Sequence, residues 1–280
     1  MRRSSAWPLA SLLALLVACF EADAEELPLW ELGIGMSAFT LPNYIGADEQ
    51  SYYALPIPYF VYRGNVVKVN REAISGKLFA TDRLRLTLSV NGSLPVDSDD
   101  NDAREGMPNL DLLGEIGPNL RYLVYVTAER RHRLLFDLPA RAVFSFDVDD
   151  VDPRGYTSTP TLRYTFTKGR WLAEVSAGAQ LADDEYNNYF YGVNPAFVTA
   201  TRREYEADAG YGGMRLGLGI AHRWDRWWVG TFFRYADLNG ATFSDSPLVL
   251  DHQGFGGGLA FAWLFARSSK TVDVDQDLFE

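Results

Sequence analysis

Large apolar residues alternate with small or polar residues through most of the chain. The alternation is clearest in residues 254–265, where every second position except Gly257 is large and apolar, and the positions between are glycine or alanine up to 262. A period of two is the period of a β-strand. A strand with one aromatic face and one nearly bare face favours a membrane barrel, whose aromatic side meets lipid. The large set comprises Phe255, Leu259, Phe261, Trp263 and Phe265.

The same alternation recurs along the chain and predicts a barrel of twelve strands. The alternative is an all-β soluble protein in which these strands form an aromatic core. The expected strands are 29–39, 51–63, 66–70, 73–80, 83–94, 112–126, 133–146, 156–167, 171–181, 207–223, 227–238 and 254–265.

Long and short connections alternate between these segments, apart from the two-residue turn at 71–72. The short turns follow residues 63, 80, 126, 167 and 223, and an outer-membrane barrel places such turns on the periplasmic side. The alternation therefore favours an even number of strands in a closed antiparallel barrel. The long loops, expected on the outside, are 40–50, 95–111, 147–155, 182–206 and 239–252.

The first residues have the pattern of a secretory signal peptide. Two arginines precede an apolar run at 9–20, and Ala22-Asp23-Ala24 ends the segment with a small-x-small site. We expect cleavage after Ala24, so that residues 1–24 are removed and 25–265 form the barrel. The alternative is a lipobox at residues 16–19, with Cys19 lipidated and retained.

Composition narrows the class of protein further. After the signal segment, no run approaches the roughly 20 apolar residues that a membrane helix needs. A chain that spans the membrane must then be a closed barrel. The net charge of −11 argues against nucleic acid as a partner. We expect the acidic tail, residues 266–280, to lie in the periplasm without regular structure.

Charged residues occupy the positions opposite the expected lipid-facing side chains. A charge inside a barrel must be paired or solvated, so this set forms either a salt-bridged plug or a narrow wet path. Arginine exceeds acid in the set, and a path would therefore prefer anions. The candidate lumen-lining residues are Arg83, Arg85, Glu115, Arg121, Asp137, Arg141, Arg163, Glu174, Arg215 and Arg234.

Catalytic residues and a dedicated metal site are not predicted. His252, beside Asp251 and close in sequence to Ser244 and Asp245, is the one candidate for a rim hydrolase, but closeness along a loop does not establish convergence in space. We therefore expect no catalytic residues. The aspartates at 97, 99, 147 and 149 supply oxygen ligands of the type that Ca²⁺ prefers. They follow no fixed loop pattern, so we expect solvated loops bridged to lipopolysaccharide by divalent ions, and no cofactor.

Several stretches resemble one family, the MipA/OmpV proteins of the Gram-negative outer membrane. They are Pro42 to Asp48, Tyr52-Tyr53, Pro56 to Tyr59, Glu185 to Val193 and Ser246 to Val249. The resemblance covers essentially the whole mature chain. One departure is that the chain continues beyond Phe265. Phe261, Trp263 and Phe265 also resemble the C-terminal signal that the barrel-insertion machinery reads.

The resemblance implies a function as well as a fold. The family's namesake resembles a scaffold that holds a lytic murein transglycosylase together with a murein synthase, and other members look porin-like or adhesin-like. No catalytic residues are implied. We therefore predict a non-enzymatic scaffold in the cell outer membrane, in contact with lipid and lipopolysaccharide. The alternative is a small-solute porin with an arginine-lined, anion-preferring lumen.

Overall fold

The computed structural model describes residues 26–64, 67–69, 74–147 and 150–273. The signal peptide and the Cys19 alternative lie outside these residues, as does the end of the acidic tail. None of the described helices is long and apolar enough to cross a membrane.

The described chain is almost entirely antiparallel β-structure. The wall strands are β2 (Trp30–Pro42), β3 (Gln50–Arg63), β4 (Val67–Val69), β5 (Ile74–Ala80), β6 (Leu84–Ser93), β7 (Leu112–Val126), β8 (His132–Pro139), β9 (Arg141–Phe146), β10 (Val151–Ser158), β11 (Thr161–Lys168), β12 (Trp171–Ala182), β13 (Gly210–Arg223), β14 (Trp227–Asp237) and β15 (Gln253–Arg267).

These strands close into a barrel. The sheet runs from β10 through β9 and β7 round to β8, and the further pairing of β7 with β8 joins its ends. Two wall strands are interrupted, one at Ala140 between β8 and β9 and one at residues 159–160 between β10 and β11. The fourteen described strands therefore occupy twelve positions in the wall, as predicted. The interruption at Pro160 is expected, because proline has no backbone N–H to donate to the hydrogen-bond ladder between strands.

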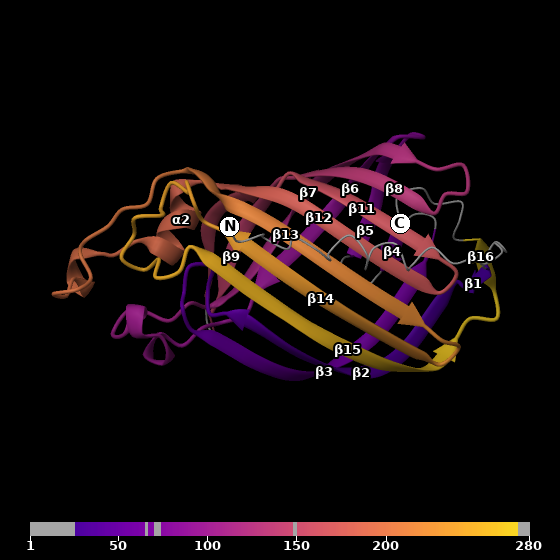
Figure 1. The fold of residues 1–280 in the computed structure, drawn as a ribbon, viewed down its shortest axis with the longest axis horizontal. Helices are drawn as coiled ribbons and strands as arrows, with labels where there is room; N and C mark the ends of the chain where they lie inside the picture. Colours follow the sequence, from indigo (N-terminus) through magenta and orange to yellow (C-terminus); the bar gives the residue numbers. More distant parts are fainter. Residues whose placement is uncertain (1–25, 65–66, 70–73, 148–149, 274–280) are drawn as a thin grey trace, which may run out of the picture.

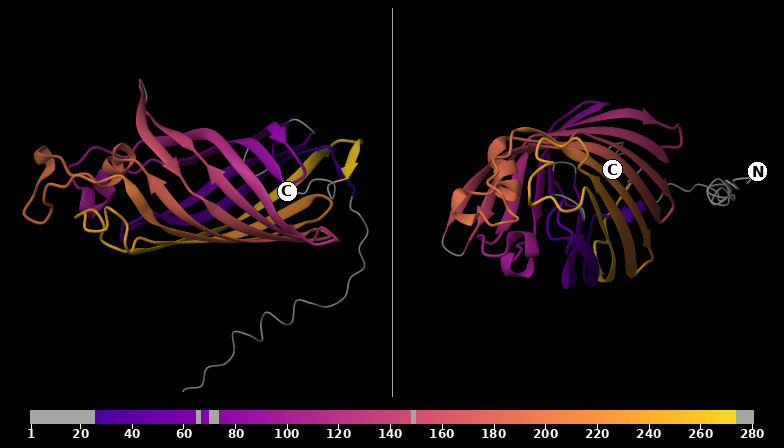
Figure 2. Two further views of the ribbon diagram at one scale, coloured as in Figure 1. Left: turned by 90° about the horizontal axis from the view of Figure 1, so that it is seen from above. Right: turned by 60° about the vertical axis from the view of Figure 1, so that its left-hand side comes forward.

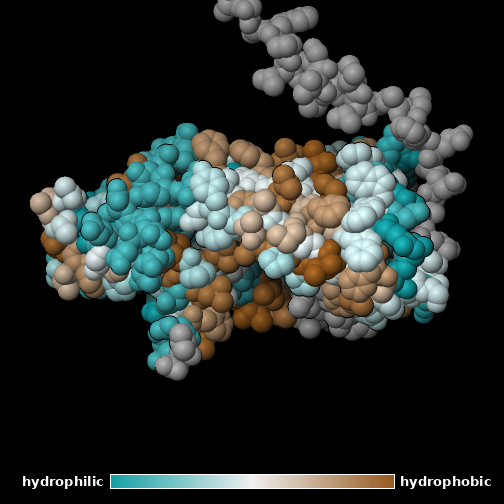
Figure 3. Space-filling model, turned by 90° about the horizontal axis from the view of Figure 1, so that it is seen from below, coloured by the Kyte–Doolittle hydropathy of each residue, from teal (hydrophilic) through white to brown (hydrophobic). Residues whose placement is uncertain are grey.

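The two faces of each strand have the predicted orientation. On β15, Phe255 and Phe261 are exposed on the outer surface, whereas Gly254, Gly256 and Ala262 are buried on the inner one. Figure 3 shows hydrophobic side chains over the middle of the barrel and hydrophilic ones over both ends. The apolar belt is the surface that lipid covers.

The barrel carries different structures at its two ends (Figure 1). Helix α2 (Asp184–Tyr191) and three short 3-10 helices, η2 (Ser98–Asp100), η3 (Asp102–Arg104) and η4 (Pro195–Phe197), lie with the long loops at the outer end. Strands β9 and β10 form a hairpin that projects from the rim (Figure 2). The expected loop 147–155 is therefore wrong in length, because β10 already begins at Val151.

A small two-stranded ribbon lies at the opposite, periplasmic end (Figure 1). It pairs β1 (Glu26–Pro28) with β16 (Thr271–Asp273), so segments from near the start and near the end of the described chain meet there. The expectation of an unstructured tail is wrong for β16. Three residues are too few to show a period, and their partner lies at the other end of the sequence.

Candidate functional site

The predicted lumen residues meet in an ion-pair network on β7, β8, β11 and β12. Arg121 Nε donates to Asp137 Oδ1 at 2.5 Å, and Arg163 Nε reaches Asp137 Oδ2 at 3.3 Å. Arg163 also donates to Glu174 at 2.8 Å, and Asn119 donates to Asp137 at 3.0 Å. Arg121 and Asp137 are direct cross-strand partners, so the strand register itself brings these charges together.

A second pair lies further toward the outer end. Arg141 Nε donates to Glu115 Oε2 at 2.8 Å, and Asn91 donates to the same oxygen at 3.2 Å. Arg141 also donates to Ser89 Oγ at 3.3 Å. With the Asp137 network, three arginines face three carboxylates, which neutralises most of the charge on this side of the lumen.

The remaining candidates occupy different environments. Arg215 donates to the Gln180 side chain and to the Gly212 carbonyl beneath the outer loops. Arg234 lies over the ring of Phe232, 5.2 Å from its centroid. Arg85 is half-buried on β6, opposite Arg121. Arg83 is exposed in the turn before β6, where its carbonyl accepts the backbone N–H of Leu123 at 2.8 Å.

The sequence analysis missed a charge cluster near the periplasmic end. Glu31 is fully buried and accepts hydrogen bonds from Arg63, at 2.9 Å, and from Arg223. The sequence could have indicated it, because Glu31, Gly33 and Gly35 are alternate residues of one strand and therefore lie on the same, inward face. Glu31 joins β2, β3 and β13, which are far apart in the chain, and so ties the wall together at this level.

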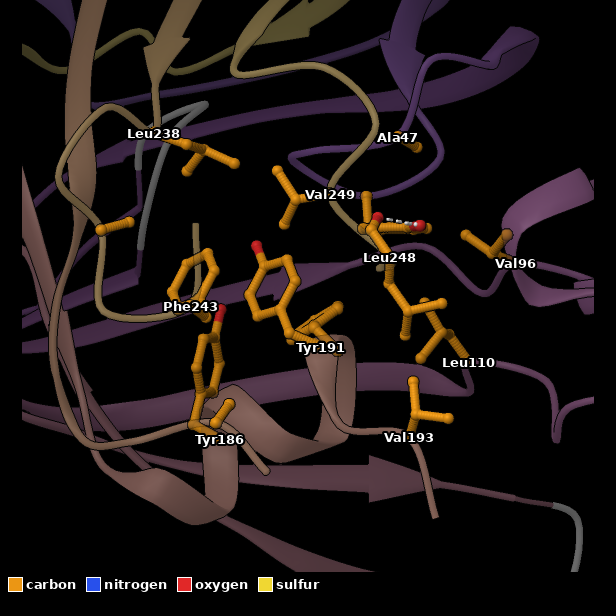
Figure 4. Close-up of a cluster of buried hydrophobic side chains, with 14 of the residues drawn as sticks. Ala47, Val96, Leu110, Tyr186, Tyr191, Val193, Leu238, Phe243, Leu248 and Val249 are labelled. Carbon is orange, nitrogen blue, oxygen red and sulfur yellow. Dashed lines mark hydrogen bonds between the residues drawn. The ribbon is translucent and has the colours of Figure 1, made fainter. Parts of the chain in front are cut away.

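The outer loops pack into a single hydrophobic core, which we call the outer cap (Figure 4). It consists of loops 43–49, 94–111, 183–209 and 238–252. Tyr191 stacks on Phe243 with ring centroids 3.7 Å apart, and Tyr44 donates to the Leu248 carbonyl at 2.6 Å. Burial raises the pKa of the Tyr44 and Tyr191 hydroxyls above the ordinary tyrosine value. The cap therefore covers the outer end with a dry interior.

The cap also joins the sequence motifs that carry the family resemblance. Tyr191 donates to the Ile45 carbonyl at 2.8 Å, and Ser246 donates to the Tyr191 carbonyl at 2.7 Å. The first loop, α2 and the segment before β15 thus hold one another by hydrogen bonds between side chains and backbone. Arg104 was not anticipated, yet it is buried here and donates to the carbonyls of Phe190 and Pro108, each at 3.1 Å.

A cavity of about 1030 Å³ occupies the lumen below the outer cap. The inner faces of all the long wall strands contribute to it, and so do Arg121, Asp137, Arg141 and Arg234. Side chains therefore do not fill the lumen completely, and its charges are not evenly distributed. Paired charges line one part of it, and bare glycines and aromatic rings line another.

The other candidates from the sequence have simpler surroundings. His252 is exposed, and the Asp251 carboxylate accepts the backbone N–H of Gln253 at 2.8 Å, as in an ordinary turn. Asp97 accepts the N–H of Asp99 at 3.1 Å and caps η2. Within the described residues, no group of three or more His, Cys, Asp or Glu side chains could hold a metal ion.

The aromatic residues at the end of β15 lie on the lipid side. Phe261, Trp263 and Phe265 are all exposed on the outer surface. Trp227 on β14 stacks on Phe261, with ring centroids 4.9 Å apart. These rings form part of an aromatic girdle near the periplasmic end of the wall.

Comparison with known proteins agrees with this architecture. The family model described as MltA-interacting protein MipA matches residues 34–265. The outer membrane protein Omp26La of Vibrio anguillarum is 25% identical over 224 residues, covering 79% of this chain and 80% of the relative.

Two solved structures show weaker similarity. A bacterial polysaccharide outer membrane secretin has a TM-score of 0.38 at 10% identity, covering 84% of this chain and 99% of that chain. The outer membrane phospholipase A from Escherichia coli has a TM-score of 0.32 at 11% identity, covering 85% of this chain and 94% of that chain.

Proposed function

The chain belongs to the MipA family of outer membrane proteins, and on that premise we propose that it is a non-enzymatic scaffold for murein-processing enzymes. Its partners are a murein transglycosylase, as the family name indicates, and a murein synthase. The barrel anchors these enzymes at the periplasmic face of the outer membrane, close to the murein layer on which they act.

The observation that carries this proposal is that the outer end of the barrel is covered and that the charges on one side of the lumen are paired. The outer cap covers one end with a packed core, and Arg121, Asp137, Arg163 and Glu174 are tied in ion pairs below it. A pore that passes solutes needs an open path and charges free to meet ions. The barrel instead favours a role in which its ends contact other proteins.

The periplasmic end offers a surface for such contacts. It combines the short turns with the ribbon of β1 and β16, which extends the barrel on the side that faces murein (Figure 1). Arg170 and Asp225, on neighbouring turns, form an exposed ion pair at 2.7 Å. Exposed pairs of this kind are worth little to stability, so they are free to exchange for contacts with a partner.

In-cell photo-cross-linking tests the scaffold directly. We would place a photoreactive residue at Asp225 in a periplasmic turn and, as the matched control, at Thr201 in the outer cap, since both are exposed. Capture of a murein transglycosylase and a murein synthase from Asp225 alone is the expected result. A chain that is folded in the membrane and captures neither enzyme from Asp225 would contradict the proposal.

The porin alternative has one observation in its favour. Arg234 points into the cavity and has no ion pair with any described residue, which leaves a positive charge in the lumen. Planar-bilayer recording of the refolded protein separates the two functions. A steady, anion-selective current that falls in Arg234→Gln would favour the porin, whereas a silent, folded barrel would favour the scaffold.

A further inference from the structure

One charged side chain in the lumen cavity has no polar partner among the described residues. Arg234 lines the cavity and lies over the ring of Phe232, but it forms no hydrogen bond or ion pair with any described residue. A guanidinium has five N–H donors, so Arg234 keeps the capacity to bind an anion. The other charged side chains that line the cavity are all bound to another side chain: Arg63 to Glu31, Arg121 and Arg163 to Asp137, Arg163 also to Glu174, Arg141 to Glu115, and Arg215 to Gln180.

Arg234 lies in a recess of the inner wall. It alternates along β14 with Phe233, which is exposed on the outer surface, so the arginine side chain points into the lumen. Its register partners on the two neighbouring strands are Gly217 of β13 and Gly256 of β15, and both glycines line the cavity. Glycine has no side chain, so the wall on either side of Arg234 leaves room for a ligand beside the guanidinium.

Three aromatic rings lie next to this recess. Phe39 on β2 stacks on Tyr53 of β3 with ring centroids 5.0 Å apart, and its centroid is 6.5 Å from that of Phe232 on β14. All three side chains line the cavity. Glycine makes this arrangement possible, because a Cβ at Gly258, between β2 and β14, would collide with the side chain of Phe39. The rings form an apolar surface inside the barrel, beside the guanidinium of Arg234.

The cavity around these groups is large enough for a ligand. Its volume is about 1030 Å³, and pockets that hold small molecules measure about 300–1,000 Å³. It extends from Tyr186 and Phe190 of α2, under the outer cap, to Arg63 and Leu172, near the periplasmic ends of β3 and β12. A ligand at Arg234 would therefore lie on the periplasmic side of the cap.

The chemistry of the recess selects for two properties of a ligand. An inorganic anion would pair with Arg234 but would leave the aromatic rings in contact with water. A neutral aromatic molecule would pack against the rings but would leave the donors of Arg234 unused. A molecule that carries a carboxylate on an aromatic body satisfies both, because a carboxylate accepts two parallel hydrogen bonds from a guanidinium and aromatic rings stack on one another.

We propose that the lumen cavity is a binding site for a small aromatic carboxylate. The carboxylate pairs with the guanidinium of Arg234, and the aromatic body packs against Phe39, Tyr53 and Phe232. This site is separate from the periplasmic surface of the proposed scaffold, so either can hold without the other. Binding also needs no open path through the outer cap, so the site does not depend on conduction through the barrel.

Equilibrium dialysis of the full barrel in nanodiscs tests the recognition of charge. The probes are 2-naphthoate and its neutral isostere 2-naphthamide, each measured against empty nanodiscs. We expect Arg234→Gln to weaken binding of naphthoate by about tenfold or more, as the loss of hydrogen bonds to a charged group implies. Binding of naphthamide should not change. Arg203→Gln, exposed in the outer cap, removes the same charge elsewhere and is the matched control. Heat-dependent mobility on gels verifies that each variant is folded.

A second variant tests the location by filling the recess. A Cβ at Gly217 would meet only the side chain of Ser176, which can rotate aside, so the leucine of Gly217→Leu can extend into the cavity. We expect this variant to lose binding of both probes, whereas Thr201→Leu, exposed in the outer cap, should bind both as the parent does.

Four outcomes overturn the proposal. They are no binding of naphthoate by the parent, equal affinity of Arg234→Gln and the parent for naphthoate, and parental binding by a folded Gly217→Leu. The fourth is an equal loss of naphthoate and naphthamide in Arg234→Gln, because Arg234 would then shape the lumen without recognising the charge of the ligand.

Discussion

The outer cap and the lumen below it both bury arginine, but they satisfy its charge in different ways. In the cap, Arg104 donates to the carbonyls of Phe190 and Pro108, and burial lowers its pKa. In the lumen, Arg121 and Arg163 share the carboxylate of Asp137. The cap uses arginine to tie loops within a dry core, whereas the lumen uses it to hold neighbouring strands in register.

The comparison shows which physical effect holds each region together. The cap is stabilised mainly by burial of apolar and aromatic side chains. Its polar side chains donate hydrogen bonds to backbone carbonyls of neighbouring loops. The lumen has few apolar side chains on its charged side, so paired charges replace a hydrophobic core there. Each region should therefore fail under a different kind of substitution.

The largest effect is expected from Phe243→Ala in the cap. Phe243 is almost fully buried and stacks on Tyr191, so its truncation should destabilise the cap by about 3–5 kcal/mol. We expect the outer loops to become sensitive to added protease while the barrel remains intact. Thr201→Ala, at an exposed position of the same cap, is the control. Unchanged protection in Phe243→Ala would show that packing does not hold the cap.

A comparable loss is expected in the lumen from Asp137→Asn. The substitution leaves Arg121 and Arg163 facing each other without a carboxylate between them, at a cost of about 3 kcal/mol. Urea unfolding in lipid bilayers, followed by tryptophan fluorescence, measures the loss. Asp137→Asn combined with Arg121→Gln should recover part of it, because Arg121 pairs with Asp137, whereas Arg163 also pairs with Glu174. Strictly additive losses would contradict a shared network.

A smaller effect is expected from Arg104→Lys. Lysine keeps the charge but cannot reach the same set of carbonyls, so we expect about 1–2 kcal/mol of lost cap stability. Hydrogen exchange of the backbone in residues 96–110 measures the change. Arg203→Lys, on the exposed rim of the cap, should leave exchange unaltered. Equal effects from both substitutions would mean that burial of Arg104 is unimportant.

The smallest effect is the pH dependence of a rim contact. The hydrogen bond from the Tyr205 hydroxyl lowers the pKa of the exposed Asp245, to which Arg203 also donates. A lowered pKa means that the contact is fully present above the ordinary aspartate range and is lost as pH falls through the lowered pKa. Cleavage beside Tyr205 by pepsin, which is active in acid, should therefore increase only as pH falls through the lowered pKa. Asp245→Asn should make cleavage independent of this transition.

The strand pattern predicted the wall because barrel geometry forces alternation. Lipid on one side and the lumen on the other require different side-chain types at successive positions of a strand. The position within this alternation was enough to identify residues such as Glu115 and Asp137 as inward-facing. The count of twelve wall strands came from the same pattern, and the alternation of long and short connections supported an even number. An error arose at a strand end, since β10 begins earlier than expected, and the alternation of side chains does not show where a strand starts.

Pairing between distant strands was not predictable in the same way. Parity gives the face of Glu31, but its partners Arg63 and Arg223 lie on strands that meet only when the barrel closes. The outer cap was expected only as separate long loops on the outside, of which the acidic ones were expected to be solvated. Its core forms because α2, the first loop and the segment before β15 meet above the lumen. The alternation of apolar and polar residues is local, so it does not show which distant loops contact one another.

By itself, the amino-acid sequence determined the membrane barrel, the inward or outward direction of side chains within the wall strands and the family, since all of these depend on local periodicity and local motifs. Only the tertiary structure decided which charges are paired and that the outer loops share one dry core. These features depend on register and closure, which are set by contacts between residues far apart in the chain.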